Sequence, residues 1–287
     1  QRWFTIGPIR VQVSELAKPV LALALCTYVA RFPLKTHKRI IGFWLLAAPI
    51  LGMVLIQPDL GSCLVLAAVA FGVFFFAAPK RGLLTPWVLL ALIASVGIWQ
   101  FVLYPYQKQR LFSFIGGEAN ESASYNARQS VITVGSGKIE GRGIGHGVQS
   151  NLRFLPEHHT DFFFASFAEE TGLIGIFCLM AMYALFFFVL AFQASTLYFF
   201  DQALRYALLS GLLFQMGVHI AMNMGLFPVT GIPLPFLSSG GSSFISLCLF
   251  VAMAMHFNAQ SVDHKPWEEV GGRPQHHVRN ESFKMIG

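Results

Sequence analysis

The sequence predicts an all-α fold, a polytopic membrane helix bundle of about seven transmembrane helices with one long extracytoplasmic loop. Of its 287 residues, 55% are hydrophobic and only 12% are charged, which leaves too little polar surface for a soluble domain of this length. The apolar residues also come in blocks, each close to the roughly 20 residues that a helix needs to cross a bilayer. The Lys and Arg residues collect between these blocks, as membrane topology requires.

Seven hydrophobic segments support the helix count. The second and third are separated only by "QPDLG", which predicts a tight helical hairpin. The fourth and fifth are separated by a long polar loop, about 105–160. The segments lie near 13–32, 40–57, 60–78, 84–104, 162–192, 204–226 and 240–257.

The segments and the loop form one membrane domain, residues 1–257, and we expect the polar residues 258–287 to be a flexible cytoplasmic tail. The chain opens at Gln1 without an initiator Met and without a signal-peptide pattern, so we expect a fragment or a trimmed chain. All four cysteines lie in apolar segments and have no disulfide or metal-ligand spacing.

The distribution of basic residues predicts the orientation. "RFPLKTHKR" (31–39), "PKRG" (79–82) and the tail lie on one side if the segments alternate, and that side should be cytoplasmic. The long loop then faces outward, although it is also basic, which suggests that it attracts an anionic ligand. The net charge of +6 does not indicate nucleic-acid binding, because no basic patch is interleaved with exposed aromatic residues. The basic residues of the loop are Lys108, Arg110, Arg128, Lys138, Arg142 and Arg153.

Polar residues stand out in the first and third segments. Glu15 and Lys18 are three residues apart and share one helix face. They are either an interfacial pair that snorkels to the headgroups or a pair that lines a cavity in the bundle. Asp59 stands between Pro58 and Gly61, where it either builds the turn and caps the next helix or serves as a functional carboxylate.

Two stretches are rich in Gly or Ser. "GSGKIEGRGIGHG" (135–147) looks like a phosphate cradle, but Lys138 is followed by Ile139 and no apolar strand precedes it, so it fails as a P-loop. We interpret it as a flexible glycine-rich loop. "LPFLSSGGSS" (234–243) predicts close helix packing, with an anion site at the helix start as the alternative.

The most unusual stretch is "PEHHTDFFFASFAEE" (156–170), which gathers carboxylates and histidines beside and inside an apolar run. A metal cage is disfavoured here, because the adjacent His158 and His159 rarely both face one ion. Thr160 or Asp161 could cap the following helix. Alternatively, Asp161 is a general base at the boundary between water and membrane.

Taken together, several stretches resemble the SEDS family of shape, elongation, division and sporulation proteins, which includes RodA and FtsW. The likeness runs from Gln1 to about Phe257, and the family's ten-helix fold implies that this chain holds the last seven helices. "YQKQRL" and "GSGKIEGRGIGHG" are closer to RodA than to FtsW, whereas Ser239 stands where the family commonly has Tyr. The stretches that carry the resemblance are "QRWFTIGPIRVQVSELAK", "QPDLGS", "YQKQRL", the block 129–175 and "GIPLPFLSSGGSS".

The resemblance implies a peptidoglycan glycosyltransferase of the bacterial cytoplasmic membrane. Such a protein polymerises lipid II, an undecaprenyl-pyrophosphate-linked disaccharide-pentapeptide, during cell-wall elongation and cell-shape maintenance. Its implied partner is a class B penicillin-binding protein, a transpeptidase that cross-links the glycan. Asp161 matches the family's essential aspartate in the "HTDF" motif and is the implied catalytic residue. The implied substrate-binding residues are Arg10, Glu15, Lys18, Asp59 and Arg110.

On this reading Asp161 takes a proton from the acceptor sugar while that oxygen attacks the donor sugar. The pyrophosphate leaving group needs positive charge, for which Arg110, Lys18 and Arg10 are suitable. A divalent cation such as Mg²⁺ could share this task, although no ligand set is legible in the sequence. The alternatives are a lipid II flippase, a division-type (FtsW-like) polymerase and a scaffold without chemistry.

Overall fold

The computed structural model describes residues 3–6, 9–57, 59–78, 81–105, 107–109, 121–151, 159–194 and 199–256. The predicted tail, 258–287, lies outside them.

The described chain is a helix bundle, which confirms the predicted fold class, and each of the seven predicted segments is helical. Five of these helices are long and apolar enough to cross a membrane. The other two, α4 and α10, have 17 and 16 residues, and a π-helical turn, η1 (Ile98–Val102), extends α4. The seven helices are α1 (Val13–Arg31), α2 (His37–Ile56), α3 (Leu60–Ala77), α4 (Arg81–Gly97), α8 (Phe163–Ala194), α9 (Phe199–Asn223) and α10 (Gly241–His256).

Three kinds of element were not predicted. A short antiparallel hairpin, β1 (Trp3–Ile6) and β2 (Ile9–Gln12), leads directly into α1. The long polar loop is not without structure, because it contains the helix α6 (Glu121–Ser136) and a single turn, α7 (Val148–Asn151). The face of α6 that packs inward includes Ser130 and Thr133, both fully buried. A search for apolar periodicity misses such a helix, because small polar residues form part of its buried face.

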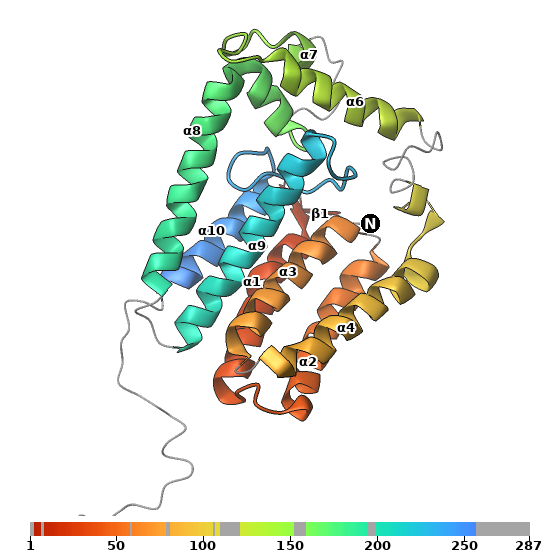
Figure 1. The fold of residues 1–287 in the computed structure, drawn as a ribbon, viewed down its shortest axis with the longest axis vertical. Coiled ribbons are helices and arrows are strands. Elements are labelled where there is room, and N and C mark those ends of the chain that lie inside the picture. The colour runs from red at the N-terminus through yellow and green to blue at the C-terminus, as the bar shows by residue number, and fades with distance from the viewer. Residues whose placement is uncertain are drawn as a thin grey trace, which may run out of the picture.

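The bundle has two distinct ends (Figure 1). α6 and α7 lie across one end, together with the start of α8 and the end of α9, and we call this the loop end. The turn between α1 and α2, with Lys35 and Lys38 exposed, lies at the other end, which we call the basic end. The carboxylate of Asp59 bonds the start of α1, so the α2–α3 turn also belongs to the loop end.

The centre of the bundle is the contact between α3 and α9, which pack closely because of small residues. A Cβ on Gly72 of α3 would lie 1.9 Å from Ser210 Oγ and 2.9 Å from the Tyr206 carbonyl oxygen of α9. A Cβ on Gly211 would lie 2.7 Å from Val69 Cγ2. Lipid tails are as apolar as Leu, so helices in a membrane associate through such close packing rather than through a hydrophobic driving force.

The outer surface of the bundle is apolar, as contact with lipid requires. On α8, Phe177 is 75% exposed and Met182 is 70% exposed. Exposed apolar side chains at this density would be unfavourable in water but are at home in a bilayer.

Topology gives the first testable prediction. Single cysteines at Glu140 and Lys35, both exposed, are introduced into a chain whose four native cysteines are replaced. An impermeant thiol reagent added outside intact cells should label Cys at position 140 and leave position 35 unlabelled until the membrane is opened, because the basic end is expected to be cytoplasmic. Labelling of both positions from outside would contradict the alternating arrangement.

Candidate functional site

The ion pair of Glu15 and Lys18 lies inside the bundle, in the first two turns of α1. Lys18 Nζ is 2.7 Å from Glu15 Oε2 and donates a second hydrogen bond of 3.3 Å to Gln215 Oε1 of α9. Glu15 is 3% exposed and Lys18 is 7% exposed. Of the two alternatives, the structure therefore supports the pair that faces the bundle interior over the pair that snorkels.

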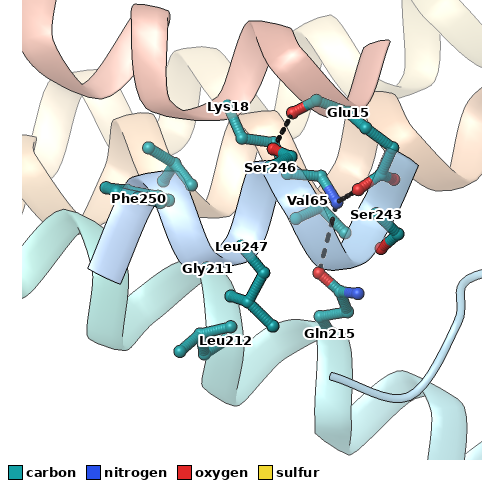
Figure 2. Close-up of a pocket in the computed structure, with 11 residues that line it drawn as sticks. Glu15, Lys18, Val65, Gly211, Leu212, Gln215, Ser243, Ser246, Leu247 and Phe250 are labelled. Carbon is teal, nitrogen blue, oxygen red and sulfur yellow. Dashed lines mark hydrogen bonds and ion pairs between the residues drawn. The ribbon is translucent and has the colours of Figure 1, made fainter. Parts of the chain in front are cut away.

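A small cavity adjoins this pair, between α1, α3, α9 and α10 (Figure 2). Ser246 Oγ, on α10, donates to the Glu15 carbonyl oxygen at 2.6 Å, and Ser243 also lines the cavity. The cavity has a volume of about 10 Å³, which is space for about one water molecule. Direct contact between Lys18 and a pyrophosphate would therefore require α10 or α9 to move away from α1.

Asp59 caps α3 and ties it to α1. One carboxylate oxygen, Oδ1, accepts from the Ser62 amide at 3.1 Å, and the other, Oδ2, accepts from Gln12 Nε2 at 2.8 Å and from Ser14 Oγ at 3.1 Å. The carboxylate is 7% exposed and bonded on both oxygens. These contacts confirm the interpretation of Asp59 as a capping residue. They also place Asp59 beside the start of α1, close in sequence to Glu15.

The structure describes the backbone of one of the two predicted arginines. Arg10 lies in β2, opposite Thr5 in the hairpin register, so its backbone leads into α1 at the loop end. Its side chain, and the whole of Arg110, lie outside the described residues.

Asp161 lies in the turn just before α8, at the loop end, and is half-buried. Its carboxylate lies against the segment that precedes α10, since a Cβ built on Gly231 would be 3.6 Å from Asp161 Oδ2. Its own carbonyl oxygen accepts a 3.1 Å hydrogen bond from Asn223 Nδ2. In the first turn of α8, the Ala165 amide donates to Asn223 Oδ1 at 3.1 Å, so a side chain from α9 caps this amide.

The serine-rich stretch before α10 holds the residues next to Asp161. Ser238 Oγ donates to the Thr160 carbonyl oxygen at 2.9 Å, and both the amide and the hydroxyl of Ser239 donate to the His159 carbonyl oxygen, at 3.0 and 2.8 Å. The serines thus join this stretch to the turn before α8 by specific hydrogen bonds. The predicted close helix packing is not seen at Gly241, where an added Cβ would meet nothing within 4 Å. Ser239, which stands where the family commonly has Tyr, thus fixes the backbone two residues before Asp161.

The glycine-rich stretch 135–147 is not a flexible loop, so that interpretation was wrong. It packs against a break in α8 at Gly172, where φ is 66° and ψ is −165°. The break frees backbone groups, and the loop bonds them: Leu173 and Ile174 amides donate to the Lys138 and Ile139 carbonyl oxygens. The amides of Arg142 and Gly143 donate to the Glu169 and Glu170 carbonyl oxygens. The glycines permit this approach, because a Cβ on Gly141 would lie 2.2 Å from the Glu170 carbonyl oxygen.

Glu169, one of the carboxylates that interrupt the apolar run, belongs to this break. Its side chain is fully buried, and Oε1 accepts from the Gln149 amide at 3.0 Å and from Ser136 Oγ at 3.4 Å. Arg142 Nε lies 3.8 Å from the same oxygen. Glu169 therefore joins α6, α7 and α8. These contacts explain why an ionisable side chain is buried at this depth of the bundle.

A bound divalent cation needs several His, Cys, Asp or Glu side chains that converge on one point. Among the residues that the structure describes, no three His, Cys, Asp or Glu side chains come together in a way that could hold a metal ion. The described part of the chain thus assigns no ligands to a divalent cation.

Sequence reasoning missed a row of polar residues on α9. Gln215, His219 and Asn223 are four residues apart and lie on one helix face, each almost or fully buried. Gln215 Nε2 donates to the Pro233 carbonyl oxygen at 2.8 Å, and His219 Nδ1 bonds the Ile232 carbonyl oxygen at 2.7 Å. The signal was present in the sequence as a polar stripe of period four inside an apolar segment.

Comparisons with known proteins agree in their assignment. The profile of the family described as cell cycle protein, which groups FtsW, RodA and SpoVE, matches residues 1–262. The peptidoglycan glycosyltransferase MrdB of Escherichia coli K12 is 36% identical over 264 residues, which is 89% of this chain and 70% of that protein. The probable peptidoglycan glycosyltransferase FtsW of Coxiella burnetii is 37% identical over 266 residues, again 89% of this chain and 70% of that protein.

Solved structures show the same likeness. A chain from a peptidoglycan synthase complex that coordinates polymerization and crosslinking has a TM-score of 0.72 and 30% identity, and the match covers 89% of this chain and 72% of that chain. The crystal structure of the rod shape determining protein RodA of Thermus thermophilus has a TM-score of 0.62 and 28% identity, covering 92% of this chain and 71% of that chain.

Proposed function

This chain belongs to the cell cycle protein family of FtsW, RodA and SpoVE, and on that premise we propose that it is a peptidoglycan glycosyltransferase that polymerises lipid II into glycan strands. The observation that carries the proposal is the placement of Asp161. It is a half-buried carboxylate at the loop end of the bundle. Asn223 donates a hydrogen bond to its carbonyl oxygen, and Ser238 and Ser239 donate to the carbonyl oxygens of Thr160 and His159.

Asp161 acts in this proposal as the general base. Its carboxylate accepts the proton of the GlcNAc 4-hydroxyl of the acceptor. The acceptor oxygen forms a bond to the anomeric carbon of the donor MurNAc, and the bond from that carbon to the undecaprenyl pyrophosphate breaks. A carboxylate at the water–membrane boundary suits this task, because the sugars of lipid II lie in water while its lipid stays in the bilayer.

Cationic residues at the loop end serve the leaving group. Pyrophosphate departs with negative charge, which Arg and Lys stabilise by charge-assisted hydrogen bonds. Arg10 and Arg110 are proposed for direct contact. Lys18 is proposed to reach the pyrophosphate only when the small cavity beside Glu15 opens.

The setting of the reaction follows from the same premise. We propose that the protein works in the bacterial cytoplasmic membrane, with the loop end outward, and that a class B penicillin-binding protein cross-links its product. The structural neighbour from a synthase complex that couples polymerization and crosslinking supports such a partner. Relatives of the MrdB and FtsW types are similar to nearly the same degree, 36% and 37%. The RodA-like motifs are the reason to propose elongation rather than division.

A chemical test separates polymerisation from transport. Lipid II whose GlcNAc 4-hydroxyl is blocked by a methyl group can still be a donor but cannot be an acceptor. The purified protein should make no polymer from blocked lipid II alone and should incorporate it once per strand when normal lipid II is present. Equal movement of both lipids across a liposome membrane, with no polymer from either, would favour the flippase instead.

The buried ion pair gives a second prediction within this proposal. Lys18→Ala leaves the Glu15 carboxylate buried without its cation, which typically costs about 3–5 kcal/mol of stability. The double variant Glu15→Gln/Lys18→Met removes both charges and should recover most of the melting temperature. If Lys18 serves the leaving group, the double variant should still polymerise lipid II poorly despite its recovered stability. Recovery of both stability and polymerisation would assign the pair a structural role alone.

A further inference from the structure

We propose that Asn223 is a positioning residue for Asp161. Asn223 holds the base at the loop end through both the oxygen and the nitrogen of its side-chain amide. The inference rests on the proposed function of Asp161. Asn223 is fully buried at the end of α9, the helix at the centre of the bundle. It touches the backbone of Asp161 but not the reacting groups, so it acts through the position of Asp161.

The contacts of Asn223 hold Asp161 and the first turn of α8 that follows it. Its Nδ2 donates to the Asp161 carbonyl oxygen at 3.1 Å, and its Oδ1 accepts from the Ala165 amide at 3.1 Å, one turn into α8. The same Nδ2 donates to the His219 carbonyl oxygen at 2.8 Å, which fixes the amide on α9 itself. A side-chain amide supplies two donors and an acceptor in one plane, and no other uncharged side chain of this length does.

Asn223 also joins a third element to the same point. Ser130 Oγ of α6 donates to the Asn223 carbonyl oxygen at 2.9 Å and lies 3.4 Å from Asn223 Oδ1. Both residues are fully buried. Three helices, α6, α8 and α9, therefore meet at Asn223, but the contact with Asp161 uses Nδ2, which Ser130 does not touch.

The row Gln215, His219 and Asn223 connects this point to the rest of the site. Gln215 accepts from Lys18 and donates to Pro233, while His219 bonds Ile232 in the segment that lies against Asp161. One face of α9 thus holds both the Lys18 pair and Asp161, so their separation is set by a rigid helix rather than by loops. Sites held on rigid elements keep the narrow geometry that catalysis needs.

The test compares Asn223→Ala with Ser130→Ala in the purified protein. Both variants remove buried hydrogen bonds at the same junction and should lower the melting temperature, but Ser130→Ala leaves the Asn223–Asp161 contact in place. We expect Asn223→Ala to lower kcat for lipid II polymerisation about 10- to 100-fold, the range that a small misplacement of a reacting group produces. Its KM for lipid II should change less than twofold. Ser130→Ala should keep the kcat of the parent when rates are expressed per folded protein.

Asn223→Ser keeps the test meaningful if the alanine variant fails to fold. Its hydroxyl can bond the His219 carbonyl oxygen within α9 but is too short to reach both Asp161 and Ala165, so kcat should again fall. If kcat per folded protein is the same in the Asn223 variants as in Ser130→Ala, Asn223 is only structural. Asp161→Asn is assayed in parallel. If that variant polymerises normally, it is the proposed role of Asp161 that fails, whatever the Asn223 variants do.

Discussion

Asp161→Asn is expected to abolish measurable polymerisation of lipid II while leaving the fold intact. The substitution preserves the size and nearly the shape of the side chain, but an amide cannot accept the proton of the acceptor hydroxyl. General-base catalysis typically contributes about 10²–10⁴-fold to the rate, so kcat should fall by that factor. The fall in kcat is measured as the steady-state rate of lipid II polymerisation by the purified variant.

The fold of this variant should be unaffected for a reason visible in the structure. The contact that ties residue 161 to Asn223 uses its backbone carbonyl, which the substitution does not change. The melting temperature and the binding of lipid II are therefore expected to match those of the parent. A variant with full kcat would exclude Asp161 as the base, and Asp59, bonded on both oxygens at the start of α3, would be the next carboxylate to test.

Gly172→Ala is expected to cause a large loss of stability. Gly172 has φ of 66° and ψ of −165°, a region that is almost restricted to Gly and costs other residues about 1–3 kcal/mol. A Cβ there would also lie 2.3 Å from the Gly141 amide nitrogen and 2.5 Å from the Ile139 carbonyl oxygen. Because these are backbone atoms held by the loop, they cannot move aside without breaking the hydrogen bonds that close the helix break.

Gly145→Ala is the matched control for this prediction. Gly145 also has a positive φ, 77°, but a Cβ there would meet nothing within 4 Å. Thermal unfolding should show a small loss for Gly145→Ala, which carries the backbone strain alone, and a much larger one for Gly172→Ala. Equal melting temperatures for the two variants would contradict the close packing of the glycine-rich stretch on α8.

The fold was predictable because membrane helices are specified by long apolar runs. Each of the seven predicted segments is helical in the structure, with ends that differ by a few residues. The helix α6 was missed because part of its buried face is made of Ser130 and Thr133, which give no apolar period. The hairpin before α1 was missed because its strands have four residues each, too short to show an alternation.

The site was predictable in its residue types but not in its connections. Asp161, Glu15, Lys18 and Asp59 were singled out because ionisable groups beside apolar runs need a reason to be there. The sequence could not show that Lys18 reaches Gln215, or that Asn223 meets Asp161 across 62 positions of chain, since such pairs depend on helix packing. The break at Gly172 was also hidden. A glycine in an apolar run is ordinary, and only its backbone angles identify the break.

The central claim is that this chain polymerises lipid II, and the most direct measurement is the product formed from purified lipid II by the purified protein alone. The prediction is a ladder of glycan strands that a muramidase cleaves back to disaccharide units, which identifies the new bonds as links between MurNAc and the 4-position of GlcNAc. Lipid II that stays monomeric in the presence of folded, lipid II-binding protein would contradict the account.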